Sequence, residues 1–355
     1  MTQDKQHNRS NVPPLRFPEF TGEWKHKTLG DISNNISSGR DKPQEGLFNL
    51  YGSTGIIGKT KIATYNGKIL LIARVGANAG LLQLVQDKCG VTDNTLVVDV
   101  ENEHEYLYYY LKHYNLNRLV FGSGQPLITG GMLKKICINF GSISERRKIA
   151  FFLYLIDRRI AVQSRVIEDL RQLKSALYQQ VFSLLEGKFV DLKTVADIVK
   201  GKQINGTELS DSGAYYVMNG GIVPSGYYED YNTEAHTISI SEGGNSCGYV
   251  QYNEEPFWSG GHCYTLKLKG EIVLRYIFHY LKYREQDIMA LRIGSGLPNI
   301  QKKDLERFQI LLPNLEEQQK LATIFDSFWR REALELSLLN DYQGQKQYLL
   351  QQMFI

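Results

Sequence analysis

The amino-acid sequence predicts an α+β fold. Two tandem domains are separated and closed by two long helices that pair antiparallel as a coiled coil, with a pseudo-twofold repeat. Three observations support this fold class: a sequence pattern that occurs twice, short β-like runs broken by glycine, and two long runs of helical periodicity. A chain of 355 residues is long enough for two or three domains that each bury a core.

The repeat is carried by three pairs of segments that share one offset of 172 residues, as in 293 − 121 = 172. The pairs are Phe121–Pro126 with Ile293–Pro298, Ser144–Ala150 with Glu316–Ala322, and Gln179–Phe182 with Gln351–Phe354. Upstream, Thr28–Ile32 matches Thr194–Ile198 after a small gap. A solenoid repeat has a period of only about 20–50 residues, so this chain is predicted to be a tandem pair of domains. A tandem pair suits a target with two parts.

The first domain is predicted over residues 23–142, after a polar leader of residues 1–22 in which two proline-containing pairs exclude helix. Short apolar runs between Gly-rich turns predict strands, and Glu105–Tyr114 predicts one helix. The second domain, residues 187–314, contains the matching helix Val273–Tyr283. We interpret the tyrosines of both helices as core side chains rather than as platforms for stacked bases.

The two long helices are predicted over residues 143–186 and 315–355, where apolar residues recur at spacings of four and three. Such a repeat is typical of a helix packed in a coiled coil. Polar Lys174 and Lys346 occupy equivalent positions of the two seams, which indicates a device that fixes the helix register. The predicted seam of the first helix is Ile149, Leu153, Ile156, Ile160, Gln163, Ile167, Leu170, Lys174, Leu177, Val181 and Leu184. The alternative is a pair of ordinary amphipathic helices, each covering its own domain.

Charge and composition exclude few functions. The net charge is +3, but residues 1–186 carry 24 Lys and Arg against 17 Asp and Glu (24 − 17 = +7), and residues 187–355 carry 17 against 21 (17 − 21 = −4). If the chain binds DNA, we expect it to borrow positive potential from a partner. No apolar run approaches the roughly 18 residues of a membrane helix, so we expect a cytoplasmic protein. The four cysteines suggest partly buried thiols, with a metal site at Cys247, His262 and Cys263 as the less favoured alternative.

The residues also resemble a known family. The lead-in Pro14–Trp24 followed by Thr28–Ile32 is similar to the start of a Type I restriction–modification specificity (S) subunit. So are the two Gly-Ser-Gly-x-Pro segments, which are followed by the similar helix starts Gly141–Ala150 and Pro313–Ala322. The resemblance extends from about Pro13 to Phe354. One departure is Ser144-Glu-Arg-Arg-Lys148, where such subunits more often have Glu-Gln-Gln-Lys, and this could alter the contact with a partner subunit.

The resemblance implies two target recognition domains, a central conserved helix and a distal conserved helix. Each domain would read one half of a bipartite double-stranded DNA site. The helices would dock two modification (M) subunits, which supply S-adenosylmethionine and adenine methylation, and restriction (R) subunits would add ATP- and Mg-dependent translocation and cleavage. The chain itself would be a non-catalytic specificity subunit without cofactors. A coiled-coil scaffold that joins proteins without reading DNA is the alternative.

No enzymatic motif competes with this interpretation. The segment Ser53–Thr60 is similar to a phosphate-binding loop, but it has serine where the first glycine of that motif must stand. Methyltransferase loops of the Asn-Pro-Pro-Phe type do not occur in the sequence. We therefore interpret Ser53–Thr60 as a structural turn.

The candidate DNA-binding residues are cations, amides and hydroxyls in or beside Gly-rich turns, because Arg and Lys reach guanine or phosphate and Asn and Gln pair with adenine. In the first domain they are Arg40, Lys42, Lys59, Lys61, Arg74, Asn78, Arg118, Ser123 and Gln125. In the second domain they are Lys200, Lys202, Gln203, Asn245, Lys282, Arg284, Arg292 and Ser295. The alternative for each charge is a solvated surface residue. For the Gly-Ser-Gly residues it is a turn that the fold requires.

Overall fold

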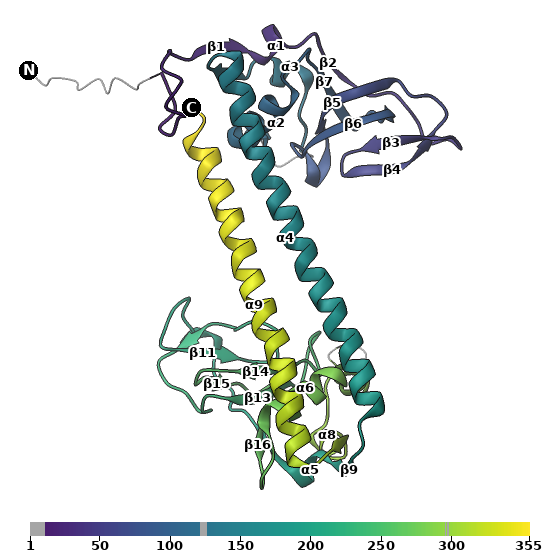
Figure 1. Cartoon of the computed structure of the whole chain (residues 1–355), viewed down its shortest axis with the longest axis vertical. Helices are drawn as coiled ribbons and strands as arrows, with labels where there is room; N and C mark the ends of the chain where they lie inside the picture. Colours follow the sequence, from purple (N-terminus) through teal and green to yellow (C-terminus); the bar gives the residue numbers. More distant parts are fainter. Residues whose placement is uncertain (1–10, 121–125, 295, 297) are drawn as a thin grey trace, which may run out of the picture. The chain divides into compact units, whose positions relative to one another are not determined.

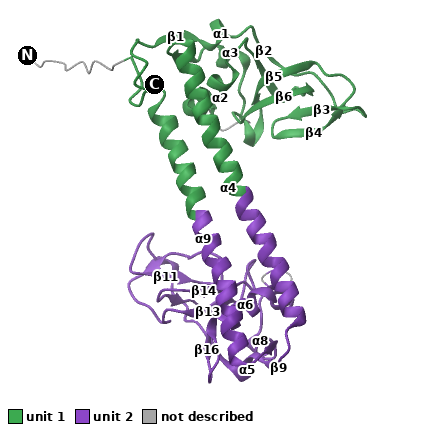
Figure 2. Ribbon diagram, viewed as in Figure 1, with its two compact units in different colours: residues 1–164, 337–355 green, residues 165–336 purple. Residues whose placement is uncertain are grey.

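The computed structural model describes residues 11–120, 126–294, 296 and 298–355. It has two compact units (Figure 2): unit 1 is Met1–Ser164 with Ser337–Ile355, and unit 2 is Arg165–Leu336. The long helices α4 (Ile143–Leu184) and α9 (Leu315–Gln352), which Figure 1 labels, each contribute one part to both units (Figure 2). The predicted α+β class, with a repeated domain and two long helices, is confirmed.

Unit 1 is built on a six-stranded mixed sheet with the order β2-β7-β5-β6-β3-β4, beside a separate β1-β8 pair. The strands are β1 Lys25–Thr28, β2 Asn35–Ser38, β3 Phe48–Gly52, β4 Gly55–Thr60, β5 Tyr65–Ala73, β6 Leu82–Val91, β7 Thr95–Asp99 and β8 Cys137–Phe140. The helices are α1 Leu29–Ile32, α2 His104–Tyr114, α3 Gly130–Lys134 and the 3-10 turns η1 Gly76–Asn78 and η2 Leu116–Leu119. Side chains alternate along β5, so Leu70 and Ile72 join the core under α2 while Ile69 and Leu71 join a second cluster.

Unit 2 repeats this plan with a four-stranded sheet, β10-β16-β13-β14, and a β17-β9 pair. The strands are β9 Lys188–Asp191, β10 Ala196–Lys200, β11 Tyr215–Met218, β12 Tyr227–Tyr228, β13 Thr237–Ser241, β14 Val250–Asn253, β15 Trp258–Ser259, β16 Cys263–Leu268 and β17 Gln309–Leu312. The helices are α5 Leu192–Val195, α6 Leu274–Tyr283, α7 Glu285–Ala290, α8 Lys302–Glu306 and the 3-10 turn η3 Gly206–Glu208. The difference lies in β11, which pairs with β12 and β15 as its own small sheet, whereas its counterpart β3 extends the main sheet by pairing with β6.

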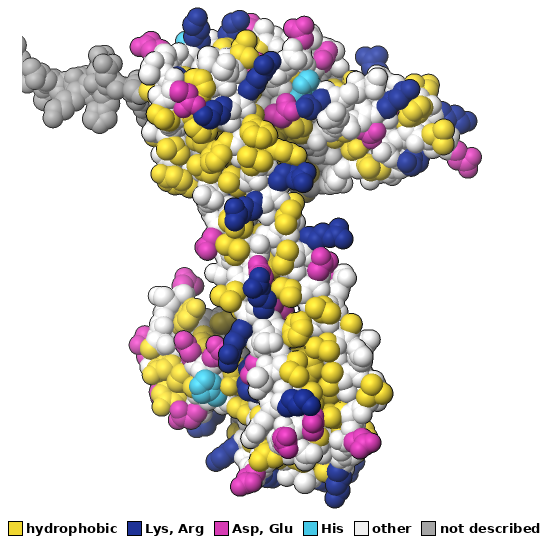
Figure 3. Space-filling model, viewed as in Figure 1, with side chains coloured by type: hydrophobic (Ala, Val, Ile, Leu, Met, Phe, Trp, Pro, Cys, Tyr) yellow, Lys and Arg dark blue, Asp and Glu magenta, His cyan; other side chains and the backbone are white. Residues whose placement is uncertain are grey.

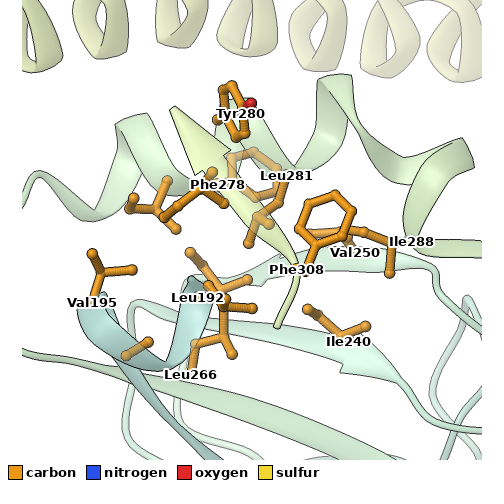
Figure 4. Packing of buried hydrophobic residues seen from close by; sticks show 14 of the residues in the cluster. Leu192, Val195, Ile240, Val250, Leu266, Phe278, Tyr280, Leu281, Ile288 and Phe308 are labelled. Atoms are coloured by element: carbon orange, nitrogen blue, oxygen red, sulfur yellow. The ribbon is translucent and has the colours of Figure 1, made fainter. Parts of the chain in front are cut away.

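The core of unit 2 lies between the four-stranded sheet and the helices. Ile240, Val250 and Leu266 extend from the strands toward Phe278 and Leu281 of α6 (Figure 4). All five side chains are buried. The tyrosines of α2 and α6 are largely core residues, as predicted, because Tyr106, Tyr109, Tyr110, Tyr276 and Tyr280 are buried.

An aromatic side chain near the end of each long helix closes the core of a unit. In unit 1, Phe354 packs against Tyr106 and Tyr110, with ring centroids 5.6 Å apart in both pairs. In unit 2, Phe182 packs against Tyr280 and Phe325 at 5.3 and 5.4 Å. The repeated segments that end in Phe182 and Phe354 therefore close the cores of different units.

Within each unit the two helix segments run antiparallel and meet at a polar layer. In unit 1, Lys346 of α9 forms an ion pair with Asp157 of α4. In unit 2, Lys174 of α4 forms an ion pair with Glu332 of α9. The predicted polar layers at these two lysines are confirmed.

Two sequence-based details are wrong. Leu184 is 76% exposed rather than part of the seam, because it lies two residues, or about 200° of helix rotation, beyond the buried Phe182. The match of Thr28 with Thr194 is shifted: Leu29 donates to Ile136 and Leu192 donates to Phe308, so the first residues of α1 and α5 correspond instead. In the part of the chain that the structure describes, no helix has the length and apolarity needed to cross a membrane.

Candidate nucleic-acid interface

Each unit presents a Gly-rich turn at the end of its central strand, tied to the residues that follow the Gly-Ser-Gly segment. We call this region the turn edge; in unit 1 it comprises residues 74–80, 92–95 and 126–128. Arg74 follows β5 and its N–H donates to Asn94 O at 2.9 Å, while Arg74 O accepts from Ile128 N–H at 2.8 Å. Gly76 N–H donates to Pro126 O at 3.0 Å.

The turn edge of unit 2 comprises residues 242–248, 260–263 and 298–300, and it makes the same three bonds. Glu242 N–H donates to His262 O at 2.9 Å, and Glu242 O accepts from Ile300 N–H at 2.8 Å. Gly244 N–H donates to Pro298 O at 3.0 Å. The two edges are therefore one backbone structure with two sets of side chains.

Glycine is required at matching points of these edges. Gly76 and Gly80 have φ of 74° and 91°, and Gly244 and Gly248 have φ of 78° and 92°, a region that side-chain-bearing residues avoid. The chain also passes very close to itself beside each edge. A Cβ on Gly39 would lie 2.1 Å from Val91 O. One on Gly201 would lie 2.2 Å from Gly260 O.

The side chains on the edge of unit 2 form a polar cluster around Glu242. Its Oε1 accepts from Lys200 Nζ at 2.7 Å and from Tyr264 OH at 2.9 Å, while His262 Nδ1 lies 3.8 Å from Oε2. Burial, followed by the bond to Glu242, raises the pKa of the Tyr264 phenol, so the phenol stays a donor at neutral pH. Exposed Asn245 stands on the adjoining turn.

In unit 1, most of the predicted DNA-binding residues lie on the surface near this edge or on the β3–β4 hairpin. Arg40, Lys42 and Lys61 are exposed in the loops that flank the hairpin. Lys59 on β4 donates to Asn49 at 2.8 Å. Gly58-Lys59-Thr60 therefore belongs to a strand, not to a loop that cradles phosphate.

The remaining predicted DNA-binding residues of unit 1 differ in exposure and in their contacts. Asn78 is exposed on η1, at the tip of the turn edge. Arg74 is half-buried at the start of that edge. Arg118 is exposed, but its guanidinium lies 4.9 Å from the centre of the Tyr114 ring.

In unit 2, the structure brings some of the predicted residues to the edge and places others elsewhere. Lys200, Lys202 and Gln203 line the strand end and loop next to Glu242, and all three are exposed. Arg292 is exposed in the segment after α7. The other two predicted cations, Lys282 and Arg284, lie at the end of α6 and have structural contacts instead.

Lys282 is half-buried, forms an ion pair with Glu285 and lies 4.1 Å from the centre of the Tyr249 ring. Burial lowers the pKa of this lysine. Arg284 forms an ion pair with Asp287. These contacts support structural roles for both. Ser123, Gln125 and Ser295 lie outside the described residues.

Sequence reasoning missed Glu242, because only cations, amides and hydroxyls were considered as DNA-binding groups. The missing signal was its match with Arg74, which has an offset of 168 (242 − 74 = 168) instead of 172. Within residues 11–120, 126–294, 296 and 298–355, no three or more His, Cys, Asp and Glu side chains cluster as metal ligands would.

The fold and the two edges define a protein with two similar α+β domains on long helices. The family of Type I restriction modification DNA specificity domains matches this chain twice, over residues 21–172 and 186–341. The chain belongs to this family. Relatives that match this chain are named as specificity subunits, among them those of the EcoprrI enzyme of Escherichia coli and the MjaVIII enzyme of Methanocaldococcus jannaschii.

Curated relatives agree with this assignment, and a solved structure has the same fold. A putative type I specificity subunit of Mycoplasma genitalium is 32% identical over 143 residues, which cover 39% of this chain and 37% of the relative. The chain thus matches well under half of that relative's length. The MjaVIII specificity subunit of Methanocaldococcus jannaschii is 24% identical over 90% of this chain and 88% of its own length. The crystal structure of the S subunit from M. genitalium superposes with a TM-score of 0.74 at 21% identity, over 97% of this chain and 99% of that one, which supports the fold.

Proposed function

We propose that this chain is the subunit that reads DNA in a Type I restriction–modification complex. Residues 23–142 and 187–314 are the two target recognition domains, and each reads one half of a bipartite duplex site. The helices of residues 143–186 and 315–355 dock two M subunits, and R subunits join that assembly. S-adenosylmethionine, ATP and Mg belong to these partners, and the DNA target places the complex in the cytoplasm.

The observation that carries the proposal is the repeated turn edge. The two edges share their backbone bonds and their required glycines but differ in their side chains. A constant frame with variable polar groups suits a reader of two unlike half-sites, because base edges are distinguished by their patterns of donors and acceptors. A scaffold that joins proteins has no need for such a frame.

Exposed apolar residues on the helices support the docking of partner subunits. Figure 3 shows hydrophobic side chains gathered on one face of unit 1. On α4, the exposed large apolar residues are Ile143, Phe151, Tyr154, Leu155, Val162, Leu173 and Leu184. On α9, they are Leu315, Ile324, Leu334, Leu338 and Tyr348. Large exposed apolar surfaces on a soluble protein mark sites of interaction.

Methylation sequencing of whole genomes tests the proposal. Cells that express an M subunit of the same system are compared with and without this chain. We expect a new adenine-methylated motif with two short parts and an unspecified gap, present only with the chain. If the M subunit is expressed and copurifies with the chain but no new motif occurs, DNA reading is excluded and the scaffold function remains.

A second measurement separates the two functions without a methylation readout. Binding of the assembled complex to duplex DNA should weaken as salt rises, because contacts to phosphates release counterions. A scaffold would show no such dependence.

A further inference from the structure

One backbone position of the turn edge carries opposite charges in the two units. Arg74 and Glu242 make equivalent bonds to Asn94 and His262, and both pairs have the same offset (242 − 74 = 168 and 262 − 94 = 168). Both residues directly follow the central strand of their sheet. The same frame thus presents a guanidinium in one unit and a carboxylate in the other.

The guanidinium of Arg74 has unused hydrogen-bonding capacity. Its Nε is buried without a hydrogen-bond partner. Across the described part of the chain, neither an ion pair nor a side-chain hydrogen bond occupies this arginine. A shielded donor without a partner is costly, and functional sites are where such groups persist. Arg74 is therefore available for a ligand with acceptors.

One oxygen of the Glu242 carboxylate accepts two hydrogen bonds, and the other accepts none among the described residues. Lys200 and Tyr264 both bind Oε1, whereas Oε2 is buried without a hydrogen-bond partner. The side chain is only 12% exposed. Two donors on one oxygen hold the group in a single orientation, and the other oxygen is shielded from solvent without a hydrogen bond.

We propose that this position reads one base pair in each half-site: Arg74 reads a guanine and Glu242 reads a cytosine. Arginine donates two bonds to guanine O6 and N7, and glutamate accepts from the cytosine N4 amino group in the major groove. This inference rests on the proposed function and assigns part of its sequence specificity to two residues.

The other cations of the two edges have a different role in this scheme. Arg40, Lys42, Lys61 and Lys202 are exposed on loops. Flexible exposed cations suit phosphate, which contributes affinity and register but no sequence information. The partly buried and oriented pair of Arg74 and Glu242 is better suited to discriminate between bases.

Glutamine substitutions test the assignment, since glutamine pairs with adenine rather than with guanine or cytosine. The full chain, bound to its M subunit, carries either Arg74→Gln or Glu242→Gln, and the methylated motif is determined by genome-wide sequencing. Each variant should change one position of one half-site, from guanine or cytosine toward adenine. The preference for the original base should fall by about tenfold or more. The other half-site should stay unchanged.

Matched controls come from a second position where the units carry opposite charges. Lys134 on α3 and Glu306 on α8 are equivalent by the 172-residue offset (306 − 134 = 172). Lys134→Gln and Glu306→Gln make the same changes of charge outside the turn edges. Both should leave the motif as it is.

An unchanged motif in both edge variants would overturn the inference, and so would an equal loss of methylation at all sites without a change of sequence. Thermal unfolding of each complex shows whether the variant is folded. If glutamine unfolds a unit, Arg74→Lys and Glu242→Asp keep the charge but shift the donors or acceptor, and they should weaken the same single position. Failure of the proposed function is distinct, because the wild-type chain would then give no gapped motif.

Discussion

In both units, a helix of the domain is linked to a long helix by a hydrogen bond to an aspartate, but the side chain that makes this bond differs. Tyr109 of α2 and His279 of α6 occupy equivalent helix positions, because their neighbours Tyr106 and Tyr276 donate to the equivalent carbonyls of Asn139 and Leu311. Each of the two side chains binds an aspartate on a long helix. The phenol of unit 1 and the imidazole of unit 2 thus serve one structural role.

The surroundings of the two aspartates differ. In unit 1, Asp157 of α4 accepts from Tyr109 OH at 2.9 Å and pairs with Lys346 of α9. In unit 2, the His279 ring lies between Asp326, with Nε2 2.7 Å from Oδ1, and Tyr178, whose OH is 2.8 Å from Nδ1. Arg275 also binds Asp326. The difference teaches that the repeat conserves the position of the link between domain and helix, while its response to pH is free to vary.

The largest effect is expected where the units are most alike, at the aromatic side chains that close their cores. Phe354→Ala should destabilise unit 1 and Phe182→Ala should destabilise unit 2, each by about 3–5 kcal/mol, since both remove a buried phenyl ring. Hydrogen exchange measured along the chain should show the loss of protection in a different unit for each variant. If both variants loosened the same unit, the assignment of each phenylalanine to its own core would be wrong.

The second prediction concerns acid stability of unit 2. Burial lowers the pKa of His279 from 6.5 to about 4. The bond to Asp326 opposes this shift but does not cancel it, and the nearby Arg275, which also binds Asp326, lowers the pKa further. The unfolded chain therefore binds a proton that folded unit 2 rejects, and stability should fall as pH decreases from about 6.5 to about 4. The shift corresponds to about 3 kcal/mol.

His279→Gln isolates this contribution. Burial also lowers the pKa of His104 and His113 in unit 1, so the whole chain has further acid-sensitive groups. Urea unfolding at several pH values gives the free energy of unfolding of the wild type and of the variant. The difference between the two cancels the contributions of His104 and His113, which both proteins share. A variant with the same pH slope as the wild type would show that His279 is not the group that titrates.

The sequence allowed the long-range plan to be predicted, because helical periodicity and a repeated motif are local signals. It showed the two helices and the polar layers at Lys174 and Lys346. It could not show which residues of the two repeated domains correspond, since loop lengths change the offset from 163 at Leu29 and Leu192 to 168 at Arg74 and Glu242. Only the backbone hydrogen bonds reveal these matches, and with them the opposite charges at the two edges.

The third prediction tests whether the turn edges share their frame. Gly39→Ala and Gly201→Ala each place a methyl group within about 2 Å of a carbonyl oxygen, so the backbone must shift. We expect both to cost about 1–3 kcal/mol in their own unit, as overpacking does. Gly58→Ala is the control, because a Cβ there meets nothing within 4 Å. Loss in one unit only, measured by thermal unfolding and local hydrogen exchange, would contradict a common frame.

The smallest effect is expected at the polar layers, and there the two units should differ. Lys174→Met leaves Glu332 with Arg171, whose Nε is 2.7 Å away, whereas Lys346→Met leaves Asp157 with the hydrogen bond from the Tyr109 phenol and the field of Lys112, which forms no ion pair with it among the described residues. Partly exposed ion pairs contribute about 1 kcal/mol or less, so both losses should be small. The loss should be larger for Lys346→Met, because it leaves a carboxylate without a directly bonded cation, whereas Glu332 keeps Arg171.

Urea unfolding of both methionine variants measures this order. Combining each with neutralisation of its acid, Glu332→Gln or Asp157→Asn, gives a double-mutant cycle for the pair. A coupling energy that is greater for Lys174 with Glu332 than for Lys346 with Asp157 would mean that Arg171 does not compensate. The layer of unit 2 would then depend on its lysine as strongly as that of unit 1.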